Sequence, residues 1–154
     1  MSPGKHLASG VVLGTAFLSA FGKVGPAVTA AAASIFCDLD HVIEYGVYCV
    51  KNKKKIKLSE FLSGSYFKHK GTIYIIFHAY EYLIALIVLL FIANRYKWKI
   101  RDFIAAVTAG YGLHLLLDTI GNECTLRGYF ISYRMKEGCD ISRICTNEKR
   151  SHTD

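Results

Sequence analysis

The sequence predicts an all-α integral membrane protein, a bundle of about four transmembrane helices followed by a short polar tail. Apolar residues make up 52% of the 154-residue chain. They gather into runs that approach the roughly 20 residues a helix needs to cross a bilayer. Runs of this length far exceed an ordinary β-strand, so they favour helices. We therefore expect one membrane domain over residues 1–122 and a polar C-terminal tail over residues 123–154.

Four apolar segments follow one another along the chain. The first runs from about Leu7 to Phe21 and is short and rich in small residues, and the second runs from Val24 to about Val50. The third, Thr72 to Ala93, is long enough to span a membrane alone. The fourth runs from Phe103 to Ile120. A soluble helical bundle is the alternative for the weaker segments, but the third segment argues against it.

The basic charge of the chain indicates a membrane surface rather than nucleic acid. The formal net charge is +7, yet no basic run is interleaved with the aromatic residues that a stacking platform for nucleic acid needs. We therefore expect membrane lipids as partners. The basic residues of the stretch 51–70 outnumber those that follow the third segment. The positive-inside rule then places this loop and both chain termini in the cytoplasm.

The five cysteines give no clear framework. They form no CxxC pair, and their odd number leaves one over in any disulfide scheme, so reduced thiols are the simplest expectation. Three lie in the tail but match no zinc pattern. The set is Cys37, Cys49, Cys124, Cys139 and Cys145.

Ionisable side chains interrupt the apolar segments, where they are costly and therefore functional candidates. They are His6, Asp38, Asp40, His41, His78, Glu81, His114 and Asp118. If each segment crosses the membrane once, all of them end near the same face, with His78 and Glu81 about one to three turns deep. Four unrelated helices would not produce this convergence by chance.

The spacings within this set suit a metal site. His114 and Asp118 are four residues apart, and the pairs Asp38–His41 and His78–Glu81 are three apart, so each pair faces one way on a helix. Imidazole with carboxylate suits Zn²⁺ first and Mn²⁺ second, and a carboxylate-rich set could hold two ions. The candidate metal ligands are His6, Asp38, Asp40, His41, His78, His114 and Asp118. Asp40 and Glu81 are the candidate catalytic carboxylates, as general base or as the group that orients a histidine.

Each of these residues also has a purely structural explanation. A histidine within the membrane can hydrogen-bond a neighbouring helix, and His6 near the terminus can be solvated. Asp40 and His41 can be interfacial residues. Glu81 is the hardest to explain in this way, because a carboxylate in an apolar helix needs a partner. As a set, the residues favour a metal site over a structural polar network.

At these residues the sequence resembles the membrane-bound metal-dependent hydrolase-like proteins of bacteria, of the LexA-regulated type. That family has an N-terminal His, then a P-D-x-D-H-like element, then H-R-G-x-T-H, and then a G-Y-x-x-H-x-x-x-D helix. The matching stretches here are Lys5–Leu7, Cys37–His41 and Gly110–Asp118. The resemblance covers most of residues 1–122 and leaves the tail unmatched.

The third element of that pattern departs from the family. His69, Lys70 and Gly71 match its start, but the family's second His falls at Tyr74. His78, about one helical turn further on, is the candidate for the missing role. Cys37 also stands where the family has the Pro of its P-D-x-D-H-like element. These departures imply a site that is either shifted or degenerate.

The resemblance implies a membrane-embedded metal-dependent hydrolase of the bacterial inner membrane. The family is similar to the all-helical zinc-dependent phospholipase C and P1 nuclease group, which implies a phosphoester or lipid-linked substrate. The alternative is a non-catalytic scaffold or a component of an envelope or transfer apparatus, with a degenerate site. A metal or proton transporter would spread the same residues across the membrane. The sequence leaves an oligomer open.

Overall fold

The structure, a computed structural model, describes residues 3–122 and 124–145, and it is all-helical as predicted. Its elements in chain order are α1 (Pro3–Phe21), α2 (Val24–Phe36), α3 (Leu39–Lys51), α4 (Leu58–Ser63), α5 (Ser65–Lys70), α6 (Tyr80–Arg95), α7 (Arg101–Gly121), the 3-10 helix η1 (Leu126–Tyr129), α8 (Ile131–Lys136) and α9 (Ile141–Ile144). An isolated antiparallel bridge pairs Thr72 with Asp140.

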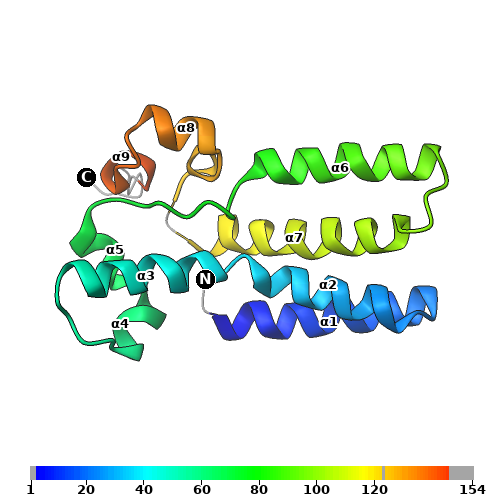
Figure 1. Cartoon of the computed structure of the whole chain (residues 1–154), viewed down its shortest axis with the longest axis horizontal. Coiled ribbons are helices and arrows are strands. Elements are labelled where there is room, and N and C mark those ends of the chain that lie inside the picture. The colour runs from blue at the N-terminus through cyan, green and yellow to red at the C-terminus, as the bar shows by residue number, and fades with distance from the viewer. Residues whose placement is uncertain (1–2, 123, 146–154) are drawn as a thin grey trace, which may run out of the picture.

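Helices α1, α2, α6 and α7 run side by side as a bundle, and the shorter helices gather at one end of it (Figure 1). Helix α2 packs against both α1 and α7, and α6 packs against α7. The links from α1 to α2 and from α6 to α7 lie at the other end (Figure 1). The end with the short helices is therefore the end where α1 begins, α2 ends, α6 begins and α7 ends.

Small residues let α2 approach its two neighbours closely. A Cβ on Gly110 of α7 would lie 2.3 Å from the carbonyl oxygen of Ala30, and a Cβ on Gly10 of α1 would lie 2.2 Å from Ser34 Oγ. Both Ala30 and Ser34 are fully buried. Such small-residue contacts are typical of helices packed within a membrane. They fix the C-terminal half of α7, which carries His114, against the end of α2.

Two helical stretches are long and apolar enough to cross a membrane. One is Val24–Lys51, which comprises α2 and α3 with a turn at Cys37 and Asp38, and the other is α7. The bundle also exposes many large apolar side chains, such as Val28 and Phe91, which marks a surface that contacts lipid. Of the four predicted spans, two therefore have the length and composition of a transmembrane helix.

The third apolar segment differs from its prediction, because residues 72–79 are not helical and α6 begins only at Tyr80. The 16 residues of α6 are fewer than the roughly 20 that a single span needs. Side chains satisfy the backbone groups of the extended stretch instead. The Tyr111 hydroxyl donates to the carbonyl oxygens of Phe77 (2.7 Å) and Ala79 (2.8 Å), and the amide of Tyr74 donates to Glu44 (2.8 Å). Buried backbone groups need such partners.

The predicted polar tail contains a folded unit, which we call the C-terminal cap (residues 124–145). It comprises η1, α8 and α9, and a disulfide between Cys124 and Cys145 closes it. The expectation that all thiols are reduced is therefore wrong for this pair, whereas Cys37, Cys49 and Cys139 are free and buried. Residues 123 and 146–154 of the predicted tail lie outside the described residues.

Candidate metal site

Side chains from separate elements meet at one end of the bundle. His6 comes from α1, Asp38 from the turn between α2 and α3, His78 from the extended stretch, and His114 and Asp118 from α7. The three histidines and Asp118 are buried. The structure thus brings together residues that are up to 112 positions apart in the chain, as the count of four segments predicts.

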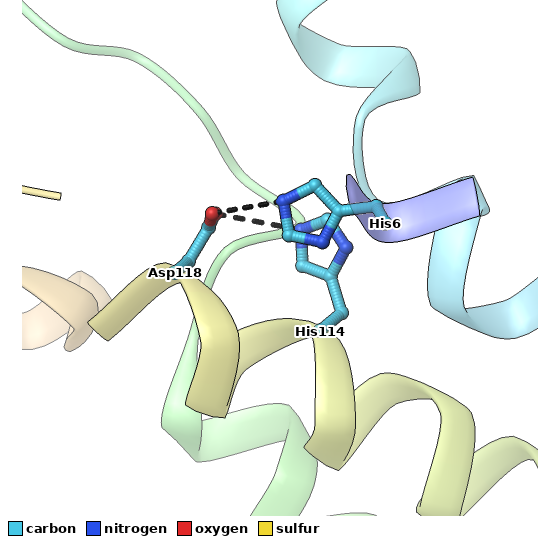
Figure 2. Close-up of side chains that lie close together, drawn as sticks. All are labelled: His6, His114 and Asp118. Atoms are coloured by element: carbon cyan, nitrogen blue, oxygen red, sulfur yellow. Dashed lines mark hydrogen bonds and ion pairs between the residues drawn. The ribbon is translucent and has the colours of Figure 1, made fainter. Parts of the chain in front are cut away.

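Asp118 joins two histidines from two different helices, as Figure 2 shows. Its Oδ1 lies 3.0 Å from His6 Nε2, and its Oδ2 lies 3.5 Å from His114 Nε2. The rings of His6 and His114 stack with their centroids 4.1 Å apart. Each oxygen of Asp118 therefore faces a different imidazole.

Donor atoms of Asp38, His78 and His114 lie within 4.8 Å of one another, and Asp118 Oδ2 contacts the same two histidines. The Nε2 atoms of His78 and His114 are 2.9 Å apart, and they lie 3.3 and 3.5 Å from Asp118 Oδ2. Both lie 3.8 Å from Asp38 Oδ1. In a tetrahedral zinc site with bonds of about 2.0–2.2 Å, ligand atoms are about 3.3–3.6 Å apart. The measured separations bracket this range, so small movements would let the two histidines share one ion with a carboxylate oxygen.

The hydrogen bonds of His78 and His114 engage both Nδ1 atoms and leave the two Nε2 atoms facing each other. Nδ1 of His114 lies 2.7 Å from the carbonyl oxygen of Ser34, which can only accept, so Nδ1 carries the proton. Nδ1 of His78 lies 3.2 Å from Asp40 Oδ2 and donates there. Histidine ligands are commonly held by a carbonyl or carboxylate in this way. The 2.9 Å contact between the Nε2 atoms therefore needs either a shared proton or a cation between the two rings.

Asp40 lies behind His78 and does not face His114. Its Oδ2 accepts the hydrogen bond from His78 and a second one from the amide of Phe77 (2.8 Å). The structure therefore favours the orienting role for Asp40 over that of a base. The ring of His41 meets that of His78 edge-on, with centroids 4.7 Å apart. Asp40, His41 and His78 form a second group whose donor atoms lie within 4.8 Å of one another.

His78 and Tyr74 lie in different surroundings. Tyr74 is exposed, whereas the imidazole of His78 is buried between Asp118 and Asp40. This is the arrangement expected if His78 replaces the family's histidine. The backbone at His78 is extended, whereas its sequence distance from Tyr74 predicted one turn of a helix.

Glu81 and His69 lie apart from these groups. Glu81 Oε1 accepts from the amide and the hydroxyl of Ser132, both at 3.0 Å. Glu81 thus anchors the C-terminal cap, and its contacts do not support the predicted catalytic role. His69 is exposed, and its Nδ1 lies 3.9 Å from Glu60 Oε1.

The C-terminal cap supplies two residues that the sequence analysis missed. Arg134 is buried and donates to the carbonyl oxygens of Ile75 and, at 3.0 Å, His78. Burial lowers the pKa of its guanidinium. The Tyr129 hydroxyl donates to the carbonyl oxygen of Asp118 at 2.9 Å, and burial, aided by the charge of Asp118, raises the pKa of this phenol. No motif marks either residue, so only their placement identifies them.

A cavity of about 390 Å³ opens onto the cluster, and Asp38, His41 and Asp118 form part of its lining. The bundle helices therefore cover the cluster, and the cavity connects it to the end of the molecule where the short helices lie. This combination suits a site that acts on a bound molecule.

The comparisons with known proteins identify the family. The family model described as YdjM inner membrane protein matches residues 1–127. The chain therefore belongs to the YdjM inner membrane protein family and is a membrane protein. No curated protein and no solved structure matches the chain. The matched region contains every candidate ligand and ends before most of the C-terminal cap.

Proposed function

We propose that this chain is a membrane-embedded, metal-dependent hydrolase acting on phosphoesters. His78, His114, Asp118 and Asp38 would hold the divalent cation, with zinc as the first choice and manganese as the second. The observation that carries the proposal is the convergence of buried imidazole nitrogens of His78 and His114 with the carboxylates of Asp38 and Asp118. The helices α1, α2, α6 and α7 would together form the membrane bundle.

The donor set fits such a cation, which would polarise a phosphoryl oxygen as a Lewis acid. Asp40 fixes the tautomer of His78 through its hydrogen bond, and His6 holds the second oxygen of Asp118. His41 lines the cavity and touches the ring of His78. Asp40 and Glu81, in contrast, do not line this cavity.

A second candidate is a non-catalytic scaffold in which the same residues only lock the helices together. The observation that favours it is the surroundings of His78, whose ring nitrogens lie within 3.8 Å of three carboxylates. These charges would stabilise a protonated imidazole, and its Nε2 could then donate to His114 with no metal present. Metal content separates the two candidates.

The test is the metal content of the protein purified in mild detergent, with His114→Ala, Asp118→Ala and the control His69→Ala. We expect stoichiometric zinc or manganese in the wild type and in His69→Ala, because His69 is remote from the cluster. The other two variants should lose most of the metal, since even an outer-shell change weakens binding roughly 10–100-fold. A folded wild type without metal would support the scaffold, and metal retained by both variants would show that His114 and Asp118 are not ligands.

The reaction is tested with bis(p-nitrophenyl) phosphate. We expect release of p-nitrophenolate that a chelator abolishes and added metal restores. A metal-replete protein that fails to cleave this and other phosphodiesters would refute the hydrolase while keeping the metal site.

A further inference from the structure

The C-terminal cap forms part of the wall of the cavity that opens onto the candidate metal site. Arg134, Ile141 and Ile144 of the cap line the cavity, together with Asp38 and Asp118 of the cluster. Carboxylates of the cluster therefore share this cavity with side chains of the cap, and Arg134, Ile141 and Ile144 lie beyond the family match at residues 1–127.

The cavity is apolar along its walls. Ile73 from the extended stretch lies beside the isoleucines of the cap, and α4 and α5 add Phe61, Leu62 and Phe67. Cationic groups lie among them, since Lys68 and Arg134 also line the space. Such a lining matches a molecule with an anionic group at one end and a hydrocarbon chain at the other.

The cap is firmly attached, so its wall has a defined position. Besides the disulfide from Cys124 to Cys145, backbone bonds join the cap to the extended stretch: Ile73 donates to Cys139 at 2.9 Å and Ile141 donates to Gly71 at 3.1 Å. These contacts place the side chains of Ile73 and Ile141 within the same lining.

We propose that the cap makes this chain selective for amphiphilic phosphoesters, with the phosphate at the metal cluster and an apolar chain along the isoleucine and phenylalanine walls. The inference rests on the proposed function and adds the apolar part of the substrate. Lys68 adds a positive charge to the same lining, and each fully buried CH₂ group strengthens binding roughly fourfold.

The experiment measures the affinity of methyl, butyl and hexyl phosphate for the zinc-supplemented full-length protein in nanodiscs, with empty nanodiscs as the background. We expect the affinity to rise at least about tenfold from methyl to hexyl phosphate. Ile141→Trp fills the cavity from the cap, and Leu62→Asp places a charge in the wall at a side chain that is 48% exposed. Both should remove the dependence on chain length and keep the affinity for methyl phosphate.

Met135→Trp is the matched control, because Met135 lies on α8 of the same cap but is exposed and does not line the cavity. It should keep the wild-type dependence on chain length. Equal affinity of the wild type for methyl and hexyl phosphate would overturn the proposal, as would an unchanged dependence in both wall variants. If the protein holds no metal and binds none of the three phosphates, the proposed function itself fails. Bound metal and methyl phosphate without a chain-length effect would overturn the cap inference alone.

Discussion

Each histidine at the site is held by a specific acceptor or donor, and these contacts decide what the site can do. His114 is fixed by the carbonyl of Ser34 and His78 by the carboxylate of Asp40. Arg134 holds the backbone of His78 from the other side. Because the rings are buried and oriented before any ligand arrives, the donor atoms are preorganised for a cation.

Replacing Arg134 with Gln should weaken metal binding without removing a ligand. The change leaves the carbonyl groups of Ile75 and His78 without their donor, which costs about 1–3 kcal/mol for a buried acceptor, and frees the extended stretch to move. We expect the metal affinity to fall roughly 10–100-fold, as measured by competition with a chelator. Arg143→Gln on the same cap is the control, because Arg143 is exposed and pairs only loosely with Glu137 at 3.7 Å. Equal affinities in the two variants would remove Arg134 from the positioning role.

The helices α1, α2 and α7 show what an apolar pattern can predict. The bounds of α1 and α7 follow the apolar runs closely, because each helix satisfies its own backbone, whereas the run from Val24 to about Val50 divides into α2 and α3. The start of α6 could not be predicted in this way. Residues 72–79 are as apolar as the helix that follows, but Asp40, Glu44 and Arg134 bond their backbone, and such long-range contacts leave no local signal.

The candidate site was predictable to a similar extent. His6, His114 and Asp118 were identified from helix ends and spacing, and the structure brings them together. The roles of Asp40 and Glu81 could not be predicted, because residue spacing does not show which side of an imidazole ring a carboxylate approaches. The contribution of the cap was also invisible, since its polar sequence contains no motif.

The close contact of α2 with α7 leads to a test by two alanine substitutions on one helix. Gly110→Ala should destabilise the protein by about 1–3 kcal/mol and weaken metal binding, because its Cβ would meet the Ala30 carbonyl and push His114 from Ser34. Gly112→Ala is the matched control, since its nearest neighbour is the flexible Leu83 at 3.4 Å. That change should be neutral or stabilise by up to about 1 kcal/mol. Thermal unfolding in detergent checks both, and equal melting temperatures would contradict the packing described for α2 and α7.

Over the whole molecule, all the short helices and the cap lie at the site end of the bundle (Figure 1). The lysine-rich loop at this end favours the cytoplasm by the positive-inside rule. The disulfide Cys124–Cys145 favours the opposite side, because such bonds persist in oxidising compartments. The disulfide thus predicts that the site end faces the periplasm, contrary to the cytoplasmic side that the sequence predicts for this loop and both termini.

Trapping thiols in intact cells tests this orientation. After an acid quench and alkylation, Cys124 and Cys145 should remain unmodified until reductant is added. A cysteine introduced by Lys54→Cys should react with an impermeant maleimide from outside the inner membrane, whereas Lys97→Cys at the other end of the bundle should not. Alkylation of both native cysteines in cells, with the reverse labelling pattern, would place the site in the cytoplasm.

X-ray absorption at the metal edge tests the central claim, a cation held by histidines and carboxylates at the end of the bundle, most directly. We predict nitrogen and oxygen ligands at about 2.0–2.2 Å with imidazole scattering from two histidines, His78 and His114. In His78→Ala the imidazole contribution should fall, whereas in the control His69→Ala it should not change. A folded, metal-free protein, or a metal whose ligands include sulfur and are the same in His78→Ala, would contradict the account.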